Sequence, residues 1–194
     1  MKGFTLVELL IVIALLGAIA IAVIAAINPI EQANRARDTR FKTDSSNLVS
    51  AIERYFTSKN EFPWVTSAFV TSNDVAFGFL SSNNVNIGVC GATCTQDGNL
   101  ITSLELKSEY KDRDFVKAGT GTDNSKKIFV GKATGGSQSI YACFIPLSKS
   151  TRDKEVADGR VYTLNFTNGT RTATTSCNAA TADWTALGCY ICVP

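Results

Sequence analysis

The sequence predicts an α+β fold, in which a long N-terminal α-helix packs on a C-terminal antiparallel β-sheet of about four strands with disulfides. Three observations lead to this prediction: an apolar stretch at residues 4–27, an amphipathic stretch at residues 28–60, and several short strand-like runs after residue 127. The chain has 194 residues, which is the length of one domain with a single core.

Residues 4–27 are apolar, and Glu8 is their one charged residue. As an α-helix they would cover about 36 Å, which is more than the roughly 30 Å hydrocarbon core of a bilayer. A cleavable secretory peptide has a shorter apolar region, of about 7–15 residues. The stretch therefore predicts a transmembrane helix.

Glu8 is unusual in such a helix, because an ionised carboxylate in lipid costs about 2.5 kcal/mol or more unless it is paired or lies near the interface. The sequence has no Lys or Arg between residues 3 and 34. The partner is therefore a lipid headgroup, water, a backbone terminus or another subunit. A cut before Phe4 would create an α-amino group four positions from Glu8. Two neighbours staggered along the helix axis would then pair amine with carboxylate.

The opening MKG, followed by FTLVELL, resembles the class III signal of type IV pilins and of the pseudopilins of secretion and competence systems. In that family a prepilin peptidase cuts after the Gly and methylates the new N-terminus. The resemblance implies cleavage between Gly3 and Phe4, N-methylation of Phe4, and an assembly role for Phe4 and Glu8. The resemblance is close over roughly the first 30 residues alone.

Gly17 lies in the middle of the apolar stretch and Pro29 follows it, so the helix has one weakened position and one missing backbone hydrogen bond. In pilins the segment between such a Gly and such a Pro loses helical order in the filament, which implies an assembly role for both residues. In the alternative interpretation, Gly17 allows close helix approach and Pro29 starts a second helix.

The apolar residues of the stretch 28–60 recur at spacings of three, four, seven and eight, which predicts an amphipathic helix continuing the first. These residues are Ile30, Ala33, Phe41, Leu48, Ala51, Ile52, Tyr55 and Phe56. The polar face mixes both charge signs and is expected either to be solvated or to meet lipid headgroups before assembly. Asn60 offers a cap and Pro63 forbids continuation, so the helix is expected to end there.

Strands are expected at residues 127–133, 139–146, 160–166 and 170–176, because these runs are rich in β-branched and aromatic residues. Asn168-Gly169 between the last two runs predicts a hairpin. With the resemblance, the chain divides into a leader (1–3), a transmembrane and polymerisation helix (4–27), its amphipathic half (28–60), a variable αβ loop region (61–126), and a sheet with a disulfide-bounded C-terminal region (127–194).

The six cysteines allow two interpretations. Cys90 with Cys94 and Cys189 with Cys192 resemble metal-ligand pairs. An exported domain with an even number of cysteines favours three disulfides, for which fifteen pairings exist. We favour Cys90–Cys94, Cys177–Cys189 and Cys143–Cys192, because the second closes a short C-terminal loop and the third joins the tail to a strand.

The composition argues against several function classes. With 19 basic and 17 acidic residues the net charge is +2, which by itself does not indicate nucleic-acid binding. The absence of histidine removes Ser/His and Cys/His pairs and His-ligated metal sites. We therefore expect no enzyme, no cofactor and no metal.

The charges on either side of the apolar stretch bear on the orientation of the head. Lys2 precedes the stretch, and more cations follow it, which would place the head in the cytoplasm. These cations are Arg35, Arg37, Arg40 and Lys42. The cysteines and the signal favour a head outside the cytoplasm instead, and we follow them.

The resemblance implies a structural subunit of a bacterial type IV pilus or pilus-like filament, which polymerises with itself. Its implied partners are prepilin peptidase, an assembly platform with its ATPase, and membrane lipid before assembly. It would lie in the cytoplasmic membrane with the head outside, and later in an extracellular pilus or periplasm-spanning filament. The alternatives are a pseudopilin of type II secretion or competence, and a minor pilin in adhesion or DNA uptake. Binding of DNA or of a surface ligand has little support, because acids interleave with the basic residues of the head.

Overall fold

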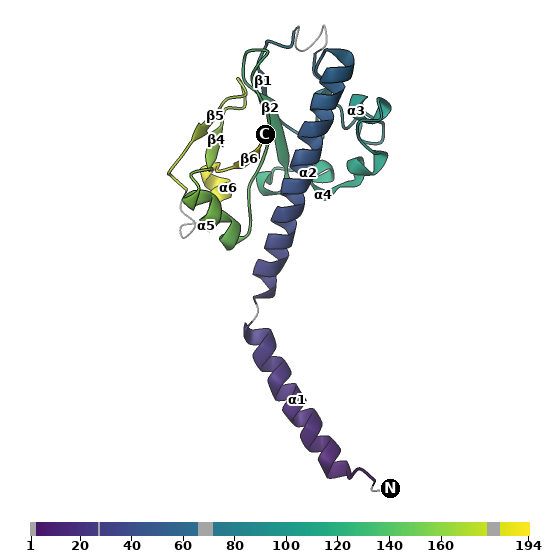
Figure 1. The fold of residues 1–194 in the computed structure, drawn as a ribbon, viewed down its shortest axis with the longest axis vertical. Coiled ribbons are helices and arrows are strands. Elements are labelled where there is room, and N and C mark those ends of the chain that lie inside the picture. Colours follow the sequence, from purple (N-terminus) through teal and green to yellow (C-terminus); the bar gives the residue numbers. More distant parts are fainter. Residues whose placement is uncertain (1–2, 27, 66–71, 178–182) are drawn as a thin grey trace.

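The computed structural model describes residues 3–26, 28–65, 72–177 and 183–194. Figure 1 shows α1 (Leu6–Ala26) extending away from a head in which α2 (Pro29–Lys59) lies along a four-stranded antiparallel sheet. The predicted α+β class is confirmed, and disulfides are present. Met1 and Lys2 of the predicted leader lie outside the described residues.

The N-terminal helical region consists of two consecutive helices rather than one continuous helix. The Asn28 side chain caps α2 by accepting a hydrogen bond of 3.2 Å from the backbone N–H of Glu31. Pro29 occupies the first turn, where a missing backbone N–H costs nothing. The alternative interpretation of Pro29 is thus the one the structure has. At the other end Asn60 adopts the left-handed conformation at φ 57° and donates to Phe56 O, as expected for the predicted helix end.

The main sheet has the order β1 (Phe77–Ser81), β2 (Ile128–Lys132), β3 (Ile140–Phe144) and β6 (Ile191–Val193). The predicted strands at 127–133 and 139–146 correspond to β2 and β3. The two edge strands were not predicted, since β1 lies in the expected loop region and β6 in the C-terminal tail. Each pairs with a strand distant in sequence, so no local hairpin signal marks it.

The two remaining predicted strands form a separate sheet. β4 (Tyr162–Leu164) and β5 (Arg171–Ala173) make the predicted hairpin, with Gly169 at φ 67° in the turn. The Arg171 guanidinium lies 3.6 Å from the ring centroid of Tyr141 in β3 and 4.2 Å from that of Tyr162. These cation–π contacts hold the hairpin against the main sheet.

Short helices occupy much of the predicted loop region. They are η1 (Val85–Ile87), α3 (Asn99–Thr102), η2 (Ser108–Asp112), α4 (Asp114–Lys117), η3 (Ala118–Thr120) and η4 (Asn124–Lys126). Two further helices, α5 (Lys149–Ala157) and α6 (Trp184–Leu187), lie in the C-terminal half. In Figure 1, α3 and α4 lie on one side of α2, and α5 with the β4–β5 hairpin lies on the other.

The core lies between α2 and the sheet. Phe41 of α2 makes edge-on contacts with Phe115 and Phe144, at centroid distances of 5.5 and 5.6 Å. The predicted apolar positions Phe41, Leu48, Ala51 and Ile52 are buried, whereas Ile30 is 72% exposed and Ala33 is also exposed. The cysteines pair as Cys90–Cys94, Cys143–Cys192 and Cys177–Cys189, the set favoured from the sequence. Cys143 and Cys192 lie opposite each other on β3 and β6.

Candidate assembly site on the N-terminal helix

The surface of α1 is apolar and uncovered. One helix of the described chain, over Leu6–Ile24, is long and apolar enough to cross a membrane, and none of it is buried against the head. Phe4, which precedes it, is 78% exposed. Apart from the adjoining backbone, no atom of the described residues lies within 4 Å of where a Cβ would stand at Gly3 or Gly17. Gly3 is thus accessible, and Gly17 leaves room on α1 for close approach by another helix.

Glu8 lies in the first turn of α1 and forms a reciprocal cap with Thr5. The backbone N–H and the hydroxyl of Thr5 donate to Glu8 Oε2 at 2.9 and 2.7 Å, and the backbone N–H of Glu8 donates to Thr5 Oγ1 at 3.2 Å. This arrangement is a capping box, which satisfies backbone donors that have no partner within the helix. The carboxylate also lies where the helix dipole favours a negative charge.

We did not predict this intrachain partner of Glu8 from the sequence. The signal was present, because Thr-x-x-Glu before an apolar run is the pattern of a capping box. Both Thr5 donors bind Oε2, and no group among the described residues donates to Oε1. The cap therefore fixes the carboxylate and leaves one oxygen open at the exposed surface of the helix.

The chain's N-terminus matches a known signal. The family model described as a prokaryotic N-terminal methylation motif matches residues 1–24. The chain carries the type IV pilin signal. The type IV pilin-like chain is also similar to a curated protein named "Fimbrial protein", from Neisseria meningitidis serogroup A / serotype 4A (strain DSM 15465 / Z2491). The two are 28% identical over 133 residues, which cover 68% of this chain and 73% of that relative. No solved structure matches the chain.

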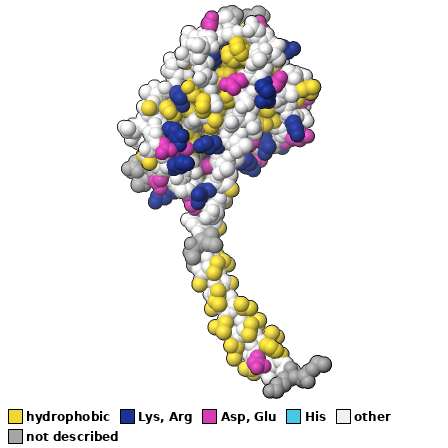
Figure 2. All heavy atoms as spheres, viewed as in Figure 1, with side chains coloured by type: hydrophobic (Ala, Val, Ile, Leu, Met, Phe, Trp, Pro, Cys, Tyr) yellow, Lys and Arg dark blue, Asp and Glu magenta, His cyan; other side chains and the backbone are white. Residues whose placement is uncertain are grey.

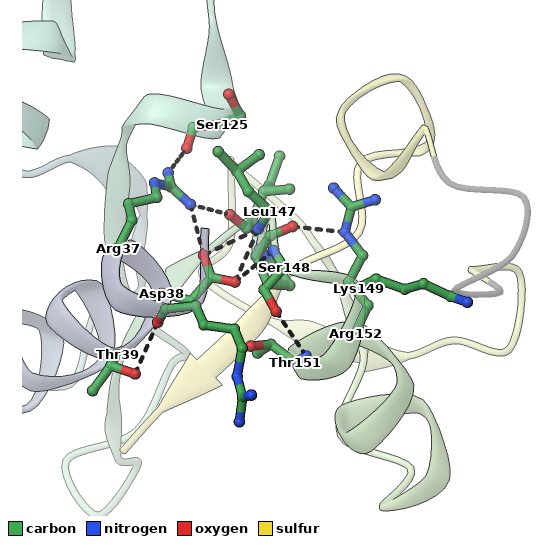
Figure 3. Close-up of polar contacts among 12 residues, drawn as sticks. Arg37, Asp38, Thr39, Ser125, Leu147, Ser148, Lys149, Thr151 and Arg152 are labelled. Carbon is green, nitrogen blue, oxygen red and sulfur yellow. Dashed lines mark hydrogen bonds and ion pairs between the residues drawn. The ribbon is translucent and has the colours of Figure 1, made fainter. Parts of the chain in front are cut away.

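Asp38 ties the second helix of this type IV pilin-like chain to its head. The Asp38 carboxylate is 2% exposed and accepts hydrogen bonds from the backbone N–H groups of Leu147 and Ser148, at 3.0 and 2.8 Å. It also pairs with Arg37 at 3.0 Å. Arg37 in turn donates to Ile145 O at 2.9 Å, and Figure 3 shows both side chains directed at this segment. The burial of Asp38 and the partial burial of Arg37 correct the expectation of a solvated face at these two positions.

Glu31 fastens the first turn of α2 to α5. Its carboxylate accepts from the Ser148 hydroxyl at 2.6 Å and from the backbone N–H groups of Lys149 and Ser150, both at 3.1 Å. These N–H groups open α5 and have no partner within that helix. The Ser148 hydroxyl first, and the Ser150 N–H second, lower the pKa of Glu31 to about 2. These bonds therefore fix the first turn of α2 to the start of α5.

Most cations that follow the apolar stretch are paired within the head. Arg37 pairs with Asp38, Arg40 with Asp114 at 3.0 Å, and Lys42 with Glu155 at 3.6 Å. The four cysteines proposed as alternative metal ligands are all in disulfides: Cys90 pairs with Cys94, whereas Cys189 pairs with Cys177 and Cys192 with Cys143. No group of three or more metal-ligating side chains occurs in the described ranges.

Proposed function

We propose that this chain is a structural subunit of a type IV pilus or pilus-like filament. In this proposal α1 anchors the subunit in the cytoplasmic membrane, a prepilin peptidase cuts between Gly3 and Phe4, and the amine of Phe4 is methylated. An assembly platform and its ATPase then polymerise subunits through α1. One observation carries the proposal: an uncovered apolar helix holds a single acid, with an open oxygen, four positions after the proposed new N-terminus. The methylation motif and the similarity to a fimbrial protein support it.

Glu8 would act in assembly through its open oxygen. The capping box holds Oε2, so Oε1 accepts the α-amino group of Phe4 from a neighbouring subunit. In an apolar environment such an amine–carboxylate pair attracts far more strongly than in water. An incoming subunit at the wrong axial level leaves both charges unpaired, so the pair sets the stagger between subunits.

Pairing of the α2 cations supports a head on the outer side of the cytoplasmic membrane. The charge bias after the apolar stretch would favour the cytoplasm, but Arg37, Arg40 and Lys42 each have an acidic partner in the folded head. The three disulfides are typical of oxidising compartments.

The test separates the charge of Glu8 from its capping role. Glu8→Gln keeps a side chain able to complete the capping box but removes the charge. We expect Glu8→Gln and Glu8→Ala to insert into the membrane normally and to lose most filaments, as counted by electron microscopy of sheared cells. Normal filament yield from Glu8→Gln would refute the pairing role.

Processing has its own test. Gly3→Ala is expected to block cleavage, so that intact-mass spectrometry finds the chain with Met1 retained in the variant and a methylated Phe4 terminus in the wild type. A cleaved, methylated Gly3→Ala product would contradict the proposed site. Mass spectrometry of isolated filaments would also distinguish a main pilus subunit from a pseudopilin or minor pilin.

A further inference from the structure

A cavity that also has Phe144 of β3 and Ile191 of β6 in its lining lies between α2 and α5, at the end of the head nearer to α1. Its volume is about 230 Å³. Arg35, Thr39 and Lys42 of α2 line one wall, and Thr151 and Lys154 of α5 line the other. Figure 2 shows Lys and Arg side chains gathered on this part of the head, with acidic side chains among them.

The charges that line the cavity leave an excess of positive groups. Its acids, Asp38 and Glu155, already have partners: Asp38 binds Arg37 and two backbone N–H groups, and Glu155 lies 3.0 Å from Arg160. Arg35 and Lys154, in contrast, have no acidic partner within 4.0 Å in the part of the chain that the structure describes. Two unpaired cations beside hydroxyl groups form a set of donors suited to a phosphate.

Chain connectivity places this cavity near the membrane surface. Arg35 lies six positions after Pro29, the first residue of α2, which is roughly 9 Å along that helix, and α2 begins three positions after the last residue of α1. The polar headgroup layer outside the hydrocarbon core is about 5–8 Å thick, and long basic side chains reach back toward it. The Glu31 hydrogen bonds hold the start of α5 beside the first turn of α2, so both walls of the cavity lie at this end of the head.

We propose that this cavity binds the phosphate of an anionic phospholipid headgroup while the subunit waits in the membrane. The proposal rests on the proposed function, since it requires α1 to be the membrane anchor. The bound headgroup holds the head in one orientation above the bilayer. It is released when the subunit leaves the membrane for the filament.

The test uses the full chain, taken up with lipid into nanodiscs of phosphatidylcholine containing phosphatidylglycerol. Native mass spectrometry of the protein released from them measures how much phosphatidylglycerol it retains. The double variant Arg35→Gln/Lys154→Gln is compared with Lys59→Gln/Lys107→Gln, which removes two exposed cations outside the cavity that also have no acidic partner in the described ranges. A near-wild-type melting temperature of the head confirms that both variants are folded.

Each Lys or Arg at an anionic surface contributes roughly a factor of five in binding, so the Arg35/Lys154 variant is expected to retain phosphatidylglycerol about 25-fold more weakly. The control variant is expected to match the wild type. Equal retention by both variants would overturn the proposal.

Inorganic phosphate distinguishes the lipid from a free anion. Added phosphate is expected to displace phosphatidylglycerol from the wild type. Phosphate binding without lipid retention would assign the cavity to a soluble anion and overturn the lipid assignment. Lipid retention is measured on the unassembled subunit, so a negative result would refute lipid binding but not the role of Glu8 in filaments. Conversely, normal filaments from Glu8→Gln would refute the role of Glu8 but not lipid binding.

Discussion

The carboxylates of Glu8 on α1 and Asp38 on α2 differ in where their hydrogen-bond donors come from. On α1, Glu8 is held by its own helix, and Oε1 receives no hydrogen bond from the described residues. On α2, Asp38 is buried at 2% exposure and accepts hydrogen bonds from a segment more than a hundred residues away in sequence. Glu8 of α1 can therefore still accept a hydrogen bond from another molecule, whereas both carboxylate oxygens of Asp38 accept hydrogen bonds within the fold. In the proposed function, the first helix therefore serves assembly, whereas the second holds the head.

The largest expected effect comes from removing the acid of α2. Asp38→Ala takes the carboxylate away from the partly buried Arg37, which keeps its bonds to Ile145 O and Ser125 O, and leaves two backbone N–H groups without an acceptor. This is expected to lower the free energy of unfolding by about 3–5 kcal/mol. Fluorescence of the buried Trp64 and Trp184 during denaturation of the full chain in micelles measures it. Arg40→Ala is the control, since its exposed pair with Asp114 contributes at most about 1 kcal/mol. Equal losses in the two variants would contradict the role of Asp38.

A smaller effect is expected at Glu31 and depends on pH. Its folded-state pKa of about 2 lies below the value of about 4.3 in an unfolded chain, so its stabilising contribution is fully present above the unfolded value. That contribution is lost as the pH falls from about 4.3 toward about 2. We expect the denaturation midpoint of the wild type to fall more steeply through this window than that of Glu31→Gln. Parallel pH profiles would show that the carboxylate does not hold α5.

The smallest effect is expected at the cap of α1. Thr5→Val removes the hydroxyl of the capping box, and amide exchange in the first turn of α1 is expected to rise about fivefold, as for a cap of typical strength. Glu8→Gln is expected to leave this exchange nearly unchanged while most filaments are lost. If Glu8→Gln frays the turn as much as Thr5→Val does, the charge and the cap cannot be separated in this way.

Local patterns determined much of the fold from the sequence. The apolar stretch of α1, the cap at Asn60 and the Asn168-Gly169 hairpin each depend on residues close together in the chain, so period, capping and turn chemistry were sufficient to predict them. The signal at Gly3, Phe4 and Glu8 was readable for the same reason. The Thr5–Glu8 cap could also have been predicted from the sequence, because its Thr-x-x-Glu pattern is local.

Only the tertiary structure decided which charges are buried and which strands complete the sheet. Arg37 and Asp38 look like a solvated face until the segment after β3 folds onto α2, and β1 and β6 acquire their strand character from β2 and β3. The physical reason is distance along the chain. A backbone N–H or a neighbouring strand from a distant part of the sequence decides whether a residue is buried, paired or part of a sheet. The local sequence pattern around that residue does not show this.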